Sequence, residues 1–401
     1  MFQECARPCH LTRAALAAFL NCFVLMACFI APVCSLLAYA QFPAPSFSSD
    51  PFMLGVPVDF SIPTQPQAFR GTDHKDHLAY ELHISNFSKA DLALKQLEIL
   101  DDASGKPLAS YAGADLEKRL MHKSEQPGNP MLVGGKWSVV FVWLDFDTGN
   151  IPHRLRHRLQ VVAPGFTQLG MQSIEGGATD VSTGPRVIGP PLTGGLWWAA
   201  DGPSNDAGHR RTLIAVDGKA RIPERFATDW AKVDETGQLL KGDATKNSSY
   251  FGYGSEVLAV ADGTVVSLLD GLVENTPDAE TRAAPMTLAN MGGNYVILDI
   301  GQQQYAFYAH LQPQSIRVKV GDHVRRGQVL ALVGDSGNAT GPHLHFQISD
   351  RNSELGTEGL PFVIDSFRLA GKMEGEKLSA YPAPESIRQA LPLDDDVIVF
   401  P

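Results

Sequence analysis

The chain has 401 residues, of which 44% are hydrophobic and 19% charged, so it is long enough for two folded domains and too apolar to be disordered. Its formal net charge of -11 argues against nonspecific binding to nucleic acid or to an anionic membrane surface, and we expect no nucleic-acid partner. Many short apolar runs bounded by Gly, Pro, Asn and Asp favour a mostly β protein.

The first forty residues have the features of an export signal. Arg7 and Arg13 precede a long apolar run that ends in "AYA", the small-x-small pattern of a signal peptidase site. We therefore expect residues 1–40 to be a signal peptide and the protein to be exported, to the periplasm or to the extracellular space and cell wall. The run is longer than a usual signal core, so an uncleaved membrane anchor is the alternative, and only then would a membrane be a partner.

Cysteine occurs only in this leader, at five positions: Cys5, Cys9, Cys22, Cys28 and Cys34. An exported protein that has lost the leader then has neither disulfides nor thiolate ligands. Any metal must be held by His, Asp or Glu.

Residues 41–76 are rich in Pro, Ser and Phe and are interpreted as an extended lead-in. Residues 77–182 follow with strand-like segments such as "LAYELHIS" and "WSVVFVWLDF", separated by turn signals, and this pattern predicts an immunoglobulin-like β-sandwich. His153 and His157 have the spacing of a metal pair only on a helix. Their segment has the pattern of a strand, so we interpret both as ordinary surface residues.

The Pro- and Gly-rich residues 183–195 are predicted to be a linker, and residues 196–350 form a second run of short strands, richer in Gly. Residues 351–401 are predicted to be an extension that packs on this second domain. Within it, "GLPFVIDSFRL" is interpreted as an added strand and "LPLDDDVIVFP" as an edge strand.

The stretch "GPHLHFQI" places His343 and His345 one residue apart in an apolar strand pattern. Alternate residues of a strand point to one face, about 6–7 Å apart, so one imidazole could bind a metal while the other reaches a water beside it. The alternative is two polar residues on a solvated strand face, because a metal site needs further ligands.

Three stretches occur in a specific order: "YAHL", "VKVGDHVRRGQVLALVGDSG" and "TGPHLHF". With them, residues 208–350 resemble the lysostaphin-type (LytM-like) zinc endopeptidases, which cut peptide bonds in bacterial peptidoglycan. The resemblance implies an antiparallel β-sheet peptidase domain, a Zn²⁺ cofactor and peptidoglycan peptide cross-links as the substrate. We expect a monomer with an immunoglobulin-like β-sandwich followed by this LytM-like domain.

The resemblance also assigns roles. It implies that His345 is a zinc ligand, His343 the general base and His310, in "YAHL", the second catalytic histidine. The strand pattern places His310 on one face with Ala306 and Tyr308.

The first ligand pair departs from the family pattern His-x-x-x-Asp. Asp229 in "RFATDW" supplies the aspartate, but the position four residues earlier is Arg225, which has no lone pair to offer a metal. We interpret His209 as the replacement ligand. Asp217 and Gly218 form a strong hairpin signal, and continuing that register places His209 opposite Phe226, three residues from Asp229. The alternative is a loop histidine that lies there by accident.

Two rival functions stay open. A metal-free LytM-like module that binds or regulates cell-wall hydrolases would explain Arg225, and a surface adhesion or carbohydrate-binding protein would be built on the sandwich. The long polar insertion at residues 270–293 is expected either to wall a substrate groove or to cover the metal.

Overall fold

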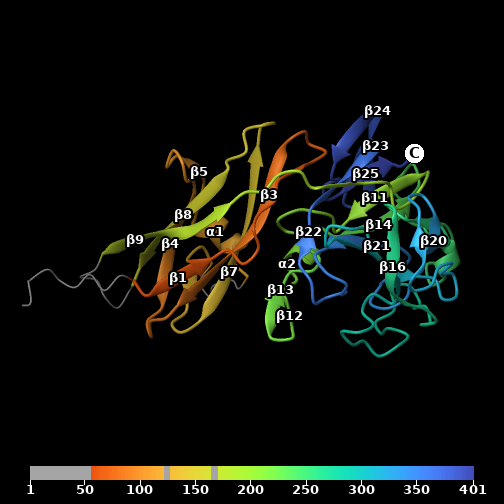
Figure 1. Cartoon of the computed structure of the whole chain (residues 1–401), viewed down its shortest axis with the longest axis horizontal. Helices are drawn as coiled ribbons and strands as arrows, with labels where there is room; N and C mark the ends of the chain where they lie inside the picture. Colours follow the sequence, from red (N-terminus) through yellow and green to blue (C-terminus); the bar gives the residue numbers. More distant parts are fainter. Residues whose placement is uncertain (1–55, 122–126, 164–169) are drawn as a thin grey trace, which may run out of the picture. The chain divides into compact units, whose positions relative to one another are not determined.

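The computed structural model describes residues 56–121, 127–163 and 170–401, so the predicted signal peptide lies outside the described residues. Strands dominate and the helices are short, which confirms the prediction of a mostly β protein (Figure 1). Among the described residues no helix is long and apolar enough to cross a membrane.

The N-terminal part of the described chain consists of two packed sheets. In one, β1, β2 and β7 pair with β3; in the other, the order is β5-β4-β8-β9, and β6 also pairs with β4. The elements are β1 (Val58–Ser61), β2 (Phe69–Arg70), β3 (Asp76–Asn86), β4 (Leu92–Asp101), β5 (Pro107–Ala112), α1 (Gly113–Arg119), β6 (Met131–Leu132), β7 (Trp137–Phe146), β8 (Arg154–Val162) and β9 (Met171–Asp180).

A single apolar core joins these two sheets. Leu82 of β3, Leu97 of β4 and Leu159 of β8 are fully buried in it. Side chains that alternate along each strand supply this inward face, which is the pattern of a β-sandwich. The immunoglobulin-like assignment itself stays a prediction.

Two expectations about this region are wrong. His157 is 0% exposed, because it lies on the same alternating face as Leu155 and Leu159, and Tyr80 Oη lies 2.8 Å from its ring. The predicted lead-in is not merely extended either, since β1 and β2 pair with β3 and Phe60 of β1 is buried in the core.

The C-terminal part contains a large sheet and two separate two-stranded sheets, β12 with β13 and β15 with β20. Its elements are β10 (Arg186–Ile188), β11 (Leu196–Ala200), α2 (Gly208–Arg211), β12 (Ile214–Val216), β13 (Lys219–Arg221), β14 (Thr228–Val233), the 3-10 turn η2 (Asn247–Ser249), β15 (Glu256–Leu258), β16 (Gly263–Leu269), β17 (Asn294–Asp299), β18 (Tyr305–Leu311), β19 (His323–Val324), β20 (Val329–Leu332), β21 (Leu344–Ser349), β22 (Gly359–Leu360), β23 (Phe362–Glu374), β24 (Lys377–Ala390) and β25 (Asp396–Val399).

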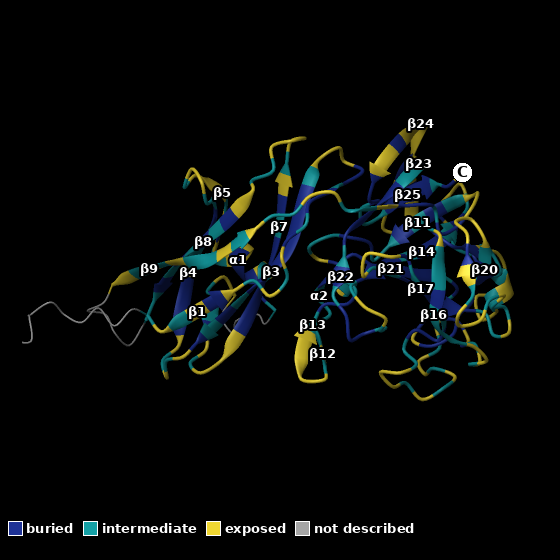
Figure 2. Ribbon diagram, viewed as in Figure 1, coloured by how far each residue is buried: buried dark blue, intermediate teal, exposed yellow. Residues whose placement is uncertain are grey.

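The main path of the large sheet runs β10-β23-β25-β11-β14-β21-β18-β17-β16-β19. Its central strands β14, β21 and β18 pair antiparallel, and their inward residues Trp230, Phe346 and Tyr308 are buried in the core. Figure 2 shows these central strands mostly dark, whereas the β12–β13 hairpin and β24 are largely exposed. The opposite face of these three strands is therefore available for a functional site.

Segments on both sides of the predicted peptidase domain join its sheet. β10, inside the predicted linker, pairs parallel with β23, and β25 lies between β11 and β23. The expectation that the C-terminal tail forms an edge is therefore wrong. Val397 and Ile398 are both 0% exposed, as an interior strand requires, and the alternation in "DVIV" alone did not reveal a partner on each side.

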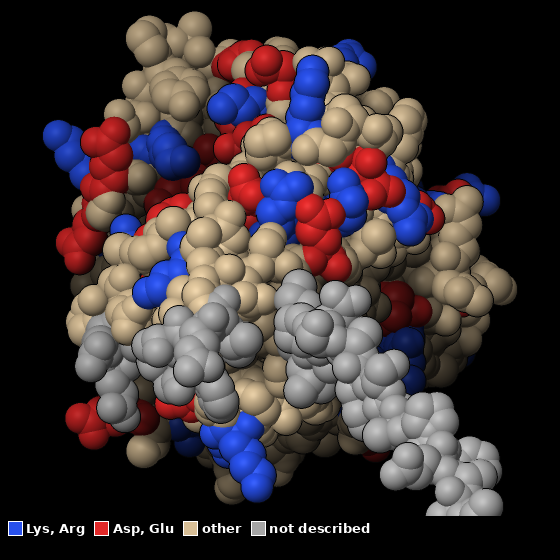
Figure 3. All heavy atoms as spheres, turned by 90° about the vertical axis from the view of Figure 1, so that its left-hand side faces the viewer, with Lys and Arg blue, Asp and Glu red and all other residues tan. Residues whose placement is uncertain are grey.

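Basic and acidic side chains are interspersed on the face of the molecule turned to the viewer in Figure 3. In the sandwich, Arg154, Arg156 and Arg158 of β8 each pair with carboxylates of neighbouring segments. Positive charge along this strand is thus locally balanced.

Candidate metal centre

The candidate site lies where β14, β21 and β18 run side by side. Asp229 of β14 is the cross-strand partner of His345 of β21, and His345 is in turn the partner of Ala309 of β18. Because alternate residues point to opposite faces, the core residues on these strands leave Asp229 and His345 on the other face. The ladder fixes both side chains.

The Asp229 carboxylate is the meeting point of three imidazole rings. His345 Nδ1 lies 3.0 Å from Oδ1, while Oδ2 lies 3.4 Å from His343 Nε2 and 3.5 Å from His209 Nε2. The structure therefore brings together the three predicted ligands and the predicted base.

Each of the three rings is oriented by a bond from its other nitrogen. The acceptors are the Asp201 carbonyl for His209 (2.9 Å), the Gly341 carbonyl for His343 (2.8 Å) and Gln347 Oε1 for His345 (2.9 Å). Since oxygen acceptors require an N–H, the nitrogens that face Asp229 have lone pairs when the rings are neutral. Lone pairs directed at a carboxylate need a cation between them, either a proton or a metal ion, so this donor set fits a divalent metal.

The charges in the site are strongly coupled. Burial alone would raise the pKa of Asp229, but His343 and His209 outweigh it and hold this pKa well below its usual range. Burial alone would lower the pKa of His345, yet the hydrogen bond with Asp229 raises it to about 9. The carboxylate thus stays ionised and draws positive charge to the site.

His209 reaches the site by a different route from the predicted one. The hairpin register is confirmed, because Val216 pairs with Lys219 and Ile214 with Arg221. The pairing stops there, and His209 lies in the one-turn helix α2 instead of opposite Phe226 on a strand. The short polar stretch "GHRR" gave no helical periodicity to detect.

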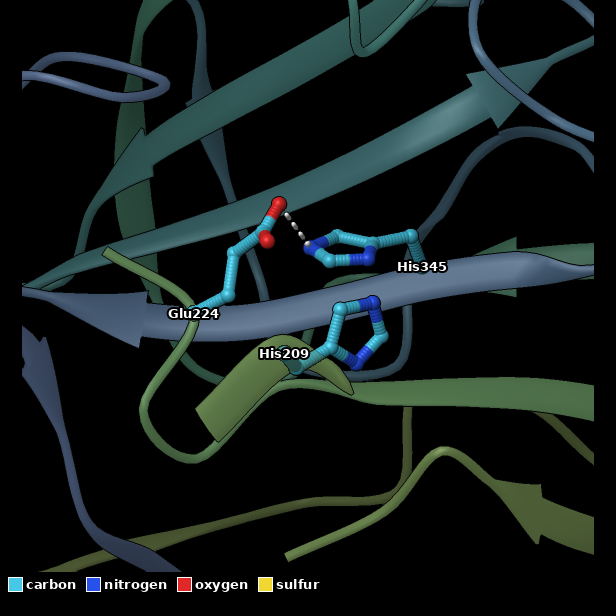
Figure 4. Close-up of side chains that lie close together, drawn as sticks. All are labelled: His209, Glu224 and His345. Carbon is cyan, nitrogen blue, oxygen red and sulfur yellow. Dashed lines mark ion pairs between the residues drawn. The ribbon is translucent and has the colours of Figure 1, made fainter. Parts of the chain in front are cut away.

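Glu224 is a further candidate ligand that the sequence did not reveal. Ligand atoms of His209, Glu224 and His345 all lie within 4.8 Å of one another, and Glu224 Oε1 is 4.0 Å from His345 Nε2. Figure 4 shows the three side chains pointing toward one another. Asp229 lies against Nδ1 of His345 and Glu224 against Nε2, so that ring has a carboxylate near each nitrogen. Glu224 lies in an irregular segment with no recognisable spacing to the other ligands.

His310 joins the site through a β-bulge. Asn294 pairs with Leu311 and Val296 with Tyr308, so two residues of β18 oppose one residue of β17. His310 has a φ of 62°, and this strained backbone turns its side chain to the cavity. The expectation that it shares a face with Ala306 and Tyr308 is wrong, because those two residues are in the core.

The His310 ring is neutral and oriented. Its Nδ1 donates to the Ser336 carbonyl at 2.8 Å, which leaves the Nε2 lone pair free. Burial, with His343 and His345 nearby, holds the pKa of His310 well below its usual range. The ring centroids of His310 and His343 are 4.8 Å apart, so the two predicted catalytic histidines lie side by side.

Arg225 is not oriented to bind a metal. Its guanidinium donates to Glu81 at 2.7 Å and to Glu358 at 2.7 Å, and the side chain is buried. An arginine at this position thus has a structural partner of its own.

The site opens into a cavity of about 410 Å³. Cavities of about 270 and 260 Å³ adjoin it, one sharing Asp229 and His343, the other sharing Glu354. Burial raises the pKa of Glu354 to about 7. The three cavities together give the site an extended groove.

The insertion at residues 270–293 forms part of the groove wall. Met291 and Gly292 line the central cavity. The Asn275 amide donates to the carbonyls of Gly337 (2.9 Å) and Ala339 (3.1 Å), which ties the insertion to the segment that leads to His343.

Residues 250–356 match the model of Peptidase family M23. Over these residues the chain is similar to M23 peptidases, which confirms the predicted resemblance. His310, His343 and His345 lie inside the matched residues, whereas His209 and Asp229 precede them.

Three curated relatives show the extent of this similarity. Over 60 residues the chain is 45% identical to peptidoglycan DD-endopeptidase ShyB of Vibrio cholerae, covering 15% of this chain and 14% of that protein. Over 135 residues it is 36% identical to ShyA of the same organism, covering 33% and 26%. Over 75 residues it is 33% identical to lysostaphin of Staphylococcus simulans, covering 18% and 15%. The chain thus spans about a quarter or less of each of these relatives.

Proposed function

We propose that this chain is an exported zinc metalloendopeptidase that hydrolyses peptide bonds in bacterial peptidoglycan, with His209, Asp229 and His345 as the zinc ligands. The observation that carries the proposal is the convergence of oriented imidazole nitrogens on the Asp229 carboxylate. Two imidazoles and one carboxylate are a common ligand set for catalytic zinc. Glu224 is the further carboxylate within reach.

Zinc in such a site supplies an electrophile for the scissile carbonyl and lowers the pKa of the attacking water. The chain's own residues manage the proton. His343, oriented by its bond to the Gly341 carbonyl, accepts the proton from the water through Nε2. His310 presents a free Nε2 lone pair beside it and orients the same water by accepting its second hydrogen.

The relatives and the cavities around the site support this substrate class. ShyA and ShyB are described as peptidoglycan DD-endopeptidases, and the matched residues include the histidines that would act on a peptide bond. An endopeptidase must accommodate substrate on both sides of the scissile bond, and the two cavities that adjoin the central one offer such space. The predicted export signal is consistent with a polymer outside the cytoplasm.

The main rival, a metal-free module that regulates other hydrolases, rested on Arg225. The buried ion pair of Arg225 with Glu81 gives that arginine a role that needs no loss of metal binding. We therefore favour the enzyme.

The test combines metal content with product analysis. Protein purified without chelator is assayed for zinc by elemental mass spectrometry and is incubated with purified peptidoglycan, whose new amino termini are identified by mass spectrometry. One zinc per chain and cleaved peptide cross-links are expected, and His345→Ala should show neither. A wild-type chain that binds no supplied zinc and cuts no wall material would refute the proposal in favour of the regulatory module.

A further inference from the structure

A buried charge cluster lies beside the candidate site and extends to the sandwich. Arg210, Glu81 and Arg225 are 0%, 3% and 3% exposed. Glu81 belongs to β3 of the sandwich, whereas the two arginines belong to the segment between β11 and β14. Buried charges need close partners, so Glu81 depends on the two arginines, whereas Arg225 has a second partner in Glu358.

Glu81 is the centre of this cluster. Arg225 Nε lies 3.1 Å from both Glu81 oxygens, and Arg225 Nη2 donates to Oε2 at 2.7 Å. Arg210 Nη1 donates to Oε1 of the same carboxylate. Arg210 Nη2 also donates to the carbonyls of Tyr80 (2.9 Å) and Val142 (3.3 Å). One glutamate therefore binds both arginines.

The position of these arginines in the chain is the important point. Arg210 directly follows His209, and Arg225 directly follows Glu224, so each arginine that Glu81 binds is the chain neighbour of a candidate ligand. Helix α2 is one turn long, and Glu224 lies outside the assigned strands. A single helical turn has little stability of its own, so contacts from elsewhere must fix both ligands.

Apolar contacts support the same attachment. Ile222 of this segment packs with Val139 and Phe141 of β7, and Arg211 lies over the Phe141 ring at 4.4 Å. The segment that carries the two ligands thus rests on the outer face of the β3–β7 sheet.

We propose that Glu81 is a positioning residue for the candidate metal centre, because it sets the places of His209 and Glu224 through Arg210 and Arg225. The sandwich thereby completes the site. Arg225 stands where the family pattern has a metal-binding histidine, and it binds Glu81 of the sandwich instead. The inference rests on the proposed function for its meaning, but its geometry can be tested without metal.

Removing the carboxylate leaves two guanidinium groups buried together. Arg225 then keeps only Glu358 and the Gly359 carbonyl, and Arg210 keeps only the Tyr80 and Val142 carbonyls. We expect both side chains to shift toward these remaining acceptors and the adjacent ligands to move with the backbone. Partners that orient metal ligands typically change metal affinity by about 10–100-fold when they are removed. We expect a loss of zinc affinity in that range for Glu81→Gln.

The experiment compares three variants of the full chain. Glu81→Gln removes the charge, and Glu81→Asp keeps the charge on a shorter side chain. Leu82→Ala is the matched control, because it weakens the same strand through the sandwich core without touching either arginine. Zinc affinity is measured by competition with a chelating dye, and the ligand geometry by the absorption spectrum of the cobalt-substituted protein.

A metal-free measurement separates this inference from the proposed function. In isotope-labelled histidine NMR of the apoprotein, Glu81→Gln should shift the His209 ring signals and leave those of His310 in place, with a smaller shift in Glu81→Asp. Glu81→Asp also decides the matter if Glu81→Gln does not fold.

Two outcomes would overturn the inference: His209 signals and a cobalt spectrum unchanged from the wild type, or the same changes in Leu82→Ala. If the wild type binds no zinc, the proposed function fails, but the His209 signals still decide whether Glu81 positions that ring.

Discussion

His345 and His209 contact the same carboxylate, but two differently built regions of the molecule hold them. His345 lies on β21, paired on one side with Asp229 of β14 and on the other with Ala309 of β18. His209 lies on a single helical turn. The next residue, Arg210, attaches this turn to the sandwich by a bond to Glu81, 129 residues away in sequence. The first region is fixed by neighbouring strands and the second by distant side chains.

This difference separates what a local motif can encode from what the whole fold must supply. In the strand region, burial of Leu344 and Phe346 sets the direction of His345 between them. In the segment between β11 and β14, which is attached to the sandwich, the local bonds that set the direction of His209 all come from Asp201. Its carboxylate accepts from the backbone N–H groups of Gly208 and His209, and its carbonyl accepts from His209 Nδ1. Substitutions in the strand region should therefore change the chemistry of the site without moving the other ligands. Substitutions around the attached segment should change the position of His209.

The largest expected effect concerns the base in the strand region. His343→Ala should lower kcat by about 10²–10⁴-fold, because general-base catalysis contributes that much, while one zinc per chain is retained. Activity on peptidoglycan fragments and zinc content are measured on the same sample. His209→Ala is the comparison, and it should lose zinc as well as activity. Loss of zinc in His343→Ala would show that His343 is a ligand.

The next largest effect is a change in how stability depends on pH, which tests the bonds of Arg210 and Arg225 to Glu81. Burial alone would raise the pKa of Glu81, but Arg210 and Arg225 outweigh burial and hold it at about 2, against an ordinary value of 4.5. A pKa depressed in the folded state gives stability that is present above pH 4.5 and is lost as the pH falls toward 2. At 1.36 kcal/mol for each pKa unit, this contribution is about 3 kcal/mol.

Glu81→Gln should therefore flatten the fall in the free energy of unfolding between pH 4.5 and pH 2, which urea titrations at several pH values measure. Glu175→Gln is the control, since Glu175 pairs with Arg156 and Arg158 in the same sandwich but is partly exposed. Exposed pairs contribute little, so its acid profile should follow the wild type. An unchanged profile in Glu81→Gln would mean that the buried cluster does not hold the segment.

The strand region was largely predictable from the sequence and the attached segment only in part. The alternation in "GPHLHFQI" and the Asp217-Gly218 turn predicted local geometry that the structure has, because both depend on backbone periodicity over a few residues. The bulge at His310 was not predictable, since its cause is a change of pairing with β17 that no local pattern reports. His157 is different: its alternation with Leu155 and Leu159 already indicated burial.

What the sequence could not supply is pairing across long separations. Glu81 and Arg225 are 144 residues apart, and neither has a spacing that relates it to the other. Glu224 was missed for the same reason, because its place depends on the anchor that follows it. Composition suggested a lead-in and a linker where β1, β2 and β10 complete sheets, since edge strands need only one partner and a short apolar run.

The smallest expected effect concerns the insertion that walls the groove on the strand side. Asn275→Ala removes the amide that donates to the carbonyls of Gly337 and Ala339 and accepts from the Ala283 N–H. Buried groups left without partners cost about 1–3 kcal/mol, so the free energy of unfolding obtained from thermal denaturation should fall by that amount. Looser residues before His343 should lower kcat and leave the His209 ring signals unchanged. Asn290→Ala, in an exposed turn of the same insertion, should cost less than about 0.5 kcal/mol. Higher activity in Asn275→Ala would instead identify the insertion as a cover over the metal, which has to move away before substrate can reach the ligands.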